Sequence, residues 1–94
     1  MKQFVYRFSD NMAFEAFEDG ALILQLSDLT FFELNKTARD ILKLTNGQND
    51  LLHVAQLFAD DYQIDLETAL EDVNDLYTQL SNQGIIEQIL MMKG

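Results

Sequence analysis

The chain has 94 residues, with 16 acidic and 6 basic side chains, a formal net charge of −10 and no cysteine. This length supports one domain with a modest core, and the lack of cysteine excludes disulfides and thiolate metal sites. Nucleic-acid binding needs basic surface to neutralise phosphates, and anionic membrane surfaces repel an acidic chain. We therefore expect a single domain over residues 1–94 that binds neither nucleic acid nor membranes.

Targeting signals are also missing from the sequence. No stretch approaches the roughly 20 apolar residues of a membrane helix. The N-terminal segment MKQFVYRFSDN lacks the apolar run and cleavage site of a secretory signal. A hydrophobic fraction of 48% argues against disorder. We expect a folded, cytoplasmic protein.

The front third of the chain predicts an antiparallel meander. Residues 13–18 (AFEAFE), 21–26 (ALILQL) and 30–34 (TFFEL) are rich in aromatic and branched residues and predict three strands. Asp19-Gly20 predicts a two-residue hairpin turn, in which Gly takes the positive φ that such turns need. Ser27-Asp28-Leu29 predicts the second turn. Within residues 1–12, FVYRF is either a further strand or an N-terminal arm.

Three helices are predicted after the meander. The first, NKTARDILKLT, has Asn35 as its N-cap and Asn46-Gly47 as its C-terminal stop. The second, DLLHVAQLFADDY, is capped by Asn49 or Asp50. The third follows Asp65, carries an apolar stripe at helical spacing and stops at Gly84.

After the third helix, IIEQIL predicts a short strand or a docked tail. Three strands followed by three helices with short connections predict an α+β domain of the winged helix-turn-helix kind, with a three-stranded antiparallel sheet.

Catalytic or metal chemistry finds little support in the sequence. His53 is the sole histidine, and acid–base catalysis would need an orienting partner that the sequence does not indicate. The segment ADDYQID lacks the glycine and terminal glutamate of a calcium loop. We expect no catalytic residue, no metal and no cofactor, and hence no enzyme.

The charged residues are unevenly distributed. Lys36, Arg39 and Lys43 fall on one predicted exposed ridge of the first helix, which favours an acidic peptide or an acidic patch as its partner. On the outer face of the third helix, acids recur at positions 67, 71 and 75. Such a face is either simply solvated or docks a basic partner.

The TFFEL segment offers a second candidate site. As an edge strand, residues 30–34 present unpaired backbone groups, to which an extended peptide can add as a further strand. As an internal strand, the same residues only supply phenylalanines to the core. Periodicity leaves both alternatives open.

Three segments together carry a family resemblance. LNKTARDILKLTNG, VAQLFADDYQID and ALEDVNDLYTQLSNQGIIE, in this order and spacing, resemble the PqqD family over residues 13–89. That family comprises coenzyme PQQ synthesis protein D and the recognition elements of ribosomally made, modified (RiPP) peptides. The resemblance implies a winged-helix, non-catalytic peptide chaperone. Such a chaperone binds the leader of a precursor peptide by strand addition and presents it to a modifying enzyme, such as a radical SAM protein.

The resemblance also implies a site between the third strand and the third helix. Lys36 and Arg39 at its margin would bind acidic leader residues. The strand side would consist of Leu29, Thr30, Phe31, Phe32 and Glu33. The helix side would consist of Leu66, Ala69, Asp72, Val73 and Leu76.

The sequence departs from the family pattern at three places, which bear on whether the product of its pathway is PQQ. PQQ synthesis members carry a Pro-Glu-Gly turn where this chain has Ser27-Asp28-Leu29, and a Gly where it has Ala38. Their Asp-Gly helix stop is Asn46-Gly47 here. These differences fit a member that serves a peptide pathway other than that of PQQ.

Other classes of protein remain as alternatives. A winged-helix regulatory domain that binds proteins shares the same element order. An acyl carrier needs a serine in Asp-Ser-Leu, whereas the order here is Ser27-Asp28-Leu29 in a strand-rich region. A DNA-binding winged helix needs a basic recognition helix, and the third helix has no Lys or Arg. The chain is a monomer or, if the FVYRF strand is exchanged, a dimer.

Overall fold

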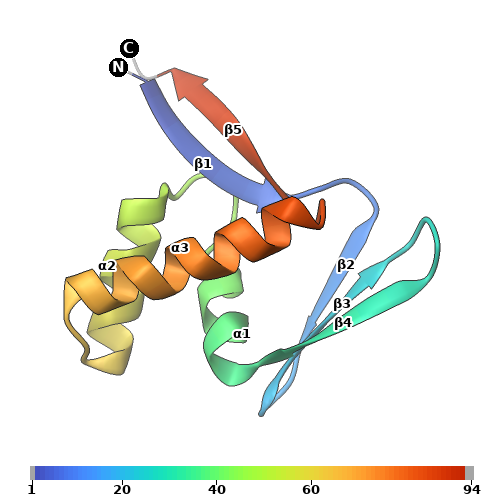
Figure 1. Cartoon of the computed structure of the whole chain (residues 1–94), viewed down its shortest axis with the longest axis horizontal. Coiled ribbons are helices and arrows are strands. Elements are labelled where there is room, and N and C mark those ends of the chain that lie inside the picture. The colour runs from blue at the N-terminus through green and yellow to red at the C-terminus, as the bar shows by residue number, and fades with distance from the viewer. Residues whose placement is uncertain (1, 93–94) are drawn as a thin grey trace.

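The computed structural model describes residues 2–92, with side-chain exposure for residues 4–90. Residues 2–92 form eight elements, labelled in Figure 1. They are β1 (Lys2–Phe8), β2 (Met12–Ala16), β3 (Gly20–Gln25), β4 (Thr30–Asn35), α1 (Lys36–Lys43), α2 (Leu51–Tyr62), α3 (Leu66–Asn82) and β5 (Ile86–Met92).

The strands form two separate antiparallel sheets. One has the order β2-β3-β4, and the other is a two-stranded ribbon of β1 and β5. Figure 1 shows the three-stranded sheet to one side of the helices and the ribbon running away from them. The α+β class, the three-stranded antiparallel sheet and the three helices are confirmed.

The ribbon answers two questions that the sequence leaves open: whether FVYRF is a strand or an arm, and whether IIEQIL is a strand or a docked tail. FVYRF lies within β1, and IIEQIL overlaps β5. The two strands pair along their whole length, from Lys2 with Met92 to Phe8 with Ile86. The ribbon is anchored to the core by ring contacts, because the Tyr6 and Tyr77 centroids lie 4.3 Å apart. Both ends of the described chain are therefore strands of one structure.

The core lies between the helices and the inner face of the three-stranded sheet. Alternation along the strands places Phe14, Ile23 and Phe32 on this face, since they are register partners. Ile23 is fully buried, and the two phenylalanines pack against the same cluster. The helices contribute the other large buried side chains, among them Phe58 and Tyr77.

All three helices begin at the predicted capping residues. The side chains of Asn35, Asp50 and Asp65 each accept a hydrogen bond from the backbone N–H three residues later, at 2.8, 2.8 and 2.7 Å. Such a bond satisfies one otherwise unpaired donor of the first turn. The sequence therefore identifies the start of each helix.

The helix ends are predicted less well. Gly84 has φ +75° and follows α3 closely, as expected. The expectation that Asn46-Gly47 ends the first helix is wrong, because α1 ends at Lys43 with Leu44 as its C-cap. Gly47 has φ +82° in the following loop, where its N–H donates to the Tyr6 carbonyl at 3.0 Å. This glycine thus joins the loop to β1 instead of capping the helix.

The predicted hairpin between β2 and β3 is present, but the expected role of its glycine is wrong. The Phe17 N–H donates to the Gly20 carbonyl at 2.8 Å, so Glu18 and Asp19 form the two-residue loop. Gly20 opens β3 and is not among the residues with positive φ. A Cβ at this position would lie 2.1 Å from the Leu34 carbonyl oxygen. Glycine is needed here for close strand approach.

Candidate functional site

β4 is an edge strand. It pairs with β3 on one side, and within residues 2–92 no strand pairs with its other side. β5 does not cover this edge, since it pairs with β1. Of the two alternatives for TFFEL, the structure therefore selects the edge strand.

The hydrogen-bonding parity of the sheet shows which backbone groups are free. The Phe17–Gly20 bond makes every second residue of β3, counted from Gly20, point toward β2. Ala21, Ile23 and Gln25 therefore point toward β4, where they pair with residues 34, 32 and 30. The N–H and C=O groups of Phe31 and Glu33 consequently point away from the sheet. These four groups form the free edge of β4.

The side chains of β4 alternate between two environments. Phe31 is 60% exposed and shares the outer face with Leu24, its register partner. Phe32 faces inward and packs against the core. Glu33 lies on the outer face opposite Leu22. A strand added to β4 would have the same alternation, with every second side chain directed toward the helix side.

A cleft lies where β4 passes into α1. One wall is formed by the β4–α1 junction and the other by one face of α3. The lining residues are Asn35, Thr37, Ala38, Ile41, Asp72, Asp75, Leu76 and Gln79. The cleft therefore adjoins the C-terminal end of β4 at Asn35.

The structure brings only part of the helix side of the expected site to this cleft. Asp72 and Leu76 line it. Ala69 and Val73 are 0% exposed and belong to the core. Leu66 is the first residue of α3 and is 39% exposed.

Sequence reasoning missed six lining residues of the cleft, two on α3 and four, Asn35, Thr37, Ala38 and Ile41, on the opposite wall. Asp75 and Gln79 follow Asp72 and Leu76 at helical spacing, and this spacing is the signal that could have identified them. Only the tertiary structure places the four residues of the opposite wall in the cleft.

The turn before β4 is ordered by side-chain bonds. The Thr30 hydroxyl donates to Oδ1 of Asp28 at 2.7 Å, and the Thr30 N–H donates to the same atom at 3.1 Å. These two bonds lower the pKa of the Asp28 carboxyl below its ordinary value. Leu29, with φ +62° and 71% exposure, projects from this turn.

The predicted basic ridge of the first helix is wrong for Arg39. Its side chain is only 14% exposed and forms an ion pair with Asp40 at 2.8 Å. Its guanidinium also donates to the carbonyl oxygens of Phe17 and Glu18, the latter at 2.7 Å. Arg39 thus joins α1 to the β2–β3 loop. Lys36 and Lys43 remain exposed.

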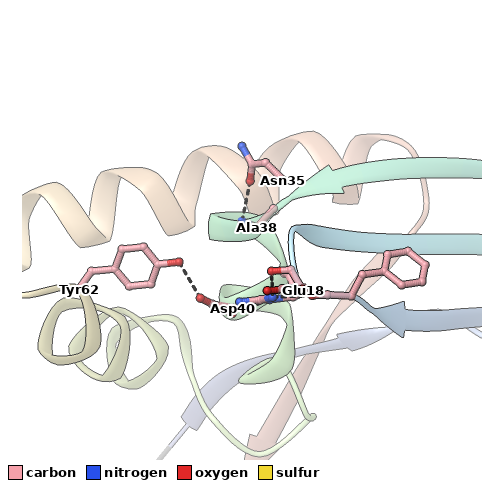
Figure 2. Close-up of polar contacts among 7 residues, drawn as sticks. Glu18, Asn35, Ala38, Asp40 and Tyr62 are labelled. Atoms are coloured by element: carbon pink, nitrogen blue, oxygen red, sulfur yellow. Dashed lines mark hydrogen bonds and ion pairs between the residues drawn. The ribbon is translucent and has the colours of Figure 1, made fainter.

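Asp40 connects this contact to α2. The Tyr62 hydroxyl donates to Oδ2 of Asp40 at 2.6 Å (Figure 2). Partial burial alone would raise the pKa of the Asp40 carboxyl, but the bonds from Tyr62 and Arg39 outweigh it and lower the pKa. The same bond raises the pKa of the Tyr62 hydroxyl. Asp40 therefore links Arg39 on α1 to Tyr62 on α2.

Two other features of the sequence lie on the surface. His53 is exposed on α2, and Glu67 and Glu71 are exposed on α3. Within the described residues, no group of three or more His, Asp or Glu is arranged to hold a metal ion. In the same part of the chain, no helix is long and apolar enough to cross a membrane.

Comparison with solved structures shows the same fold in three peptide-pathway proteins. TbiB1 in complex with the TbiA(β) leader peptide is 22% identical with a TM-score of 0.77, over 86% of this chain and 94% of that one. A lasso peptide synthetase B1 complexed with its leader peptide is also 22% identical with a TM-score of 0.77, over 87% and 96% of the two chains.

The third solved structure is the PqqD truncation of Methylobacterium extorquens PqqCD, a stand-alone RiPP recognition element. It is 22% identical with a TM-score of 0.74, over 88% of each chain. No curated protein sequence matches the chain. The family model for coenzyme PQQ synthesis protein D (PqqD) matches residues 20–86, which include the sheet edge, the cleft and all three helices. The chain belongs to the PqqD family.

Proposed function

We propose that this protein binds the leader segment of a ribosomally made precursor peptide as a fourth strand on β4 and presents it to a peptide-modifying enzyme. The observation that carries this proposal is the free edge of β4, at Phe31 and Glu33, next to the α1–α3 cleft. Strand addition uses main-chain bonds for affinity and pockets for alternate side chains as the source of specificity.

The similar structures support this choice of guest. Two of the three similar structures described above are complexes with leader peptides, and the third is a RiPP recognition element. In this chain, the four edge groups would form four hydrogen bonds, each contributing about 0.5–1.5 kcal/mol net. The protein itself would act in the cytoplasm as one non-catalytic domain.

The candidate site residues divide into five roles. Phe31 and Glu33 supply the main-chain bonds, and Leu29, Thr30 and Phe32 shape the edge. Asp72 and Leu76 contact the guest where it enters the cleft. Lys36, exposed at the start of α1, is the cation available to an acidic leader residue. Buried Ala69 and Val73, and Leu66 at the start of α3, position α3.

Amide-resolved NMR titration with synthetic leader segments of candidate precursor peptides tests the proposal. The amides of Phe31 and Glu33 should shift and gain protection from hydrogen exchange, because they acquire bonding partners. The amide of Phe32 should keep its protection, since it already faces β3. Shifts confined to α2 or to the β1–β5 ribbon would refute strand addition at β4.

A further inference from the structure

The outer face of the three-stranded sheet is apolar and exposed. Ala13, Leu24 and Phe31 are register partners and form a row across all three strands. Phe17 at the end of β2 is 50% exposed, and Phe31 is 60% exposed. Together with Leu22, Leu24 and the β2–β3 loop, these two phenylalanines line a shallow hollow. We refer to Ala13, Phe17, Leu22, Leu24 and Phe31 as the outer patch.

Acidic side chains border the outer patch. Leu22 within the patch lies between Glu15 and Glu33 on the two neighbouring strands, and both glutamates are exposed. The β2–β3 loop adds Glu18 and Asp19, which also line the hollow. Residues 12–35 contain no Lys or Arg. Arg39 contacts this loop, but its guanidinium is already bound to two carbonyl oxygens and to Asp40.

This charge distribution indicates which kind of partner can bind the outer patch. An apolar centre with a polar rim is the usual anatomy of a protein–protein interface. A second copy docked through the same face would bring the two acidic rims together, and like charges at an interface oppose association. A partner whose apolar patch is bordered by Lys and Arg is complementary to this face.

The outer patch is also continuous with the proposed guest site. Phe31 belongs to both, because its side chain lies on the outer face and its backbone groups point to the free edge. A guest strand on β4 would extend the sheet by one strand. Every second guest side chain would then lie on the outer face beside Phe31.

We infer that the outer patch docks the peptide-modifying enzyme, through an apolar, Lys- and Arg-bordered surface of that enzyme. The enzyme then contacts the sheet and alternate side chains of the bound leader together, so that it recognises the loaded complex. This inference rests on the proposed function, but it concerns a different face from the guest edge.

The test uses a purified candidate peptide-modifying enzyme, such as a radical SAM protein, with affinities measured by calorimetry. Leu24→Lys places a cation within the outer patch and should weaken enzyme binding at least about tenfold. Phe17→Ser, at a half-exposed position, should weaken it severalfold. Leu52→Lys is the matched control, because Leu52 is 47% exposed on α2. It should leave enzyme affinity within about twofold.

Leader affinity, measured in parallel, separates this inference from the proposed function. It should stay within about twofold in all three variants. Enzyme affinity that is unchanged in both outer-patch variants overturns the inference. A self-association that these variants abolish, seen by sedimentation, overturns it in favour of a second copy. If the native chain binds the enzyme but no leader, the proposed function is refuted and the inference about the outer patch is not.

Salt dependence tests the acidic rim independently. Exposed charges more than a Debye length apart are screened at moderate ionic strength. Affinity for the enzyme should therefore fall between about 0.05 and 0.5 M salt, and Glu15→Gln should reduce that fall. An affinity that does not change with salt contradicts the basic border assigned to the partner.

Discussion

Phe31 and Phe32 are consecutive residues of β4 and lie on opposite faces of the sheet. Phe31 is 60% exposed, whereas Phe32 packs against the core. Their backbone groups also point in opposite directions within the sheet, because Phe32 pairs with Ile23 and Phe31 points to the free edge. A test of strand addition therefore has to change an outward backbone group, at residue 31 or 33.

Glu33→Pro removes one outward N–H from the β4 edge. Proline cannot donate to a ladder but is tolerated at edges, so the fold should persist and leader affinity should fall about fivefold to tenfold. Glu33→Ala keeps the donor and serves as the control, with a change within about twofold. Phe32→Pro would instead break the bond to β3 and destabilise the domain. Equal leader affinity for Glu33→Pro and Glu33→Ala would contradict main-chain pairing at this residue.

Arg39 is expected to stabilise the fold without contacting the guest. Its guanidinium bonds two loop carbonyls and the Asp40 carboxylate at once. Arg39→Ala should lower the free energy of unfolding by about 1.5–3 kcal/mol, the range for bonds to charged groups. Arg39→Lys should recover little, since an ammonium lacks the planar fork. Urea denaturation measures the loss.

Lys36 provides the comparison for Arg39. It is exposed, and its charge is the smallest of the influences that lower the pKa of the Asp40 carboxyl. Lys36→Ala should leave stability within about 0.5 kcal/mol and weaken binding of a leader that carries an acidic residue there. If Arg39→Ala remains folded and weakens leader binding more than Lys36→Ala does, Arg39 and not Lys36 contacts the leader.

Asp40 should make stability depend on pH in the acid range. Its pKa in the folded protein lies below the ordinary 3.8, since bonds from Tyr62 and Arg39 outweigh the effect of burial. A lowered carboxyl pKa contributes stability that is present above the unfolded-state value and is lost as pH falls through the folded-state value. Asp40→Asn should therefore destabilise the protein at pH 7 and have a smaller effect near pH 3. Thermal melts at both pH values measure this difference, and an equal effect at the two would exclude the linkage.

The local features of this fold are readable from the sequence, whereas the positions of the cleft residues are not. The caps at Asn35, Asp50 and Asp65 depend on side chains that bond within one turn, so the residue type is sufficient. The edge position of β4 depends on where β5 pairs, and IIEQIL contains no indication of its partner. Arg39 fits an exposed helical ridge by periodicity, but its position depends on a loop about twenty residues away.

Gly20 illustrates the same limit and gives a further prediction. Together with Asp19, this glycine indicates a turn in the sequence. In the structure, glycine is required for a different reason: the Cβ of any other residue at position 20 would lie 2.1 Å from the Leu34 carbonyl oxygen. Gly20→Ala should separate β3 from β4 and cost about 1–3 kcal/mol. Gly84→Ala is the comparison, because Gly84 has φ +75° but open space around it. It should cost about 1–2 kcal/mol through backbone strain alone, and Gly84→Asn should cost less. Denaturation midpoints rank the three variants, and a neutral Gly20→Ala would contradict the close approach.

Thr45 and Tyr77 form a buried hydrogen-bonded pair between the end of α1 and α3. The Thr45 hydroxyl donates to the Ile41 carbonyl at 3.0 Å, so the Tyr77 hydroxyl is the donor in the 2.6 Å contact between the two side chains. Tyr77→Phe removes this donor and should cost about 1 kcal/mol, whereas Thr45→Val leaves the phenol without an acceptor and should cost about 1–3 kcal/mol. The double variant should cost less than the sum of the two, which a double-mutant cycle measures.

The same pair predicts an alkaline transition. Burial raises the pKa of Tyr77 to about 12, from an ordinary value of 10.0. A raised pKa in the folded state means that the unfolded chain ionises first, so stability is intact below pH 10 and declines as pH rises toward 12. Absorbance at 295 nm should show a phenolate that forms only near pH 12, and Tyr77→Phe should lose that step. If the difference between the two proteins instead appears near pH 10, the Tyr77 hydroxyl is accessible to water and the buried pair with Thr45 does not persist in solution.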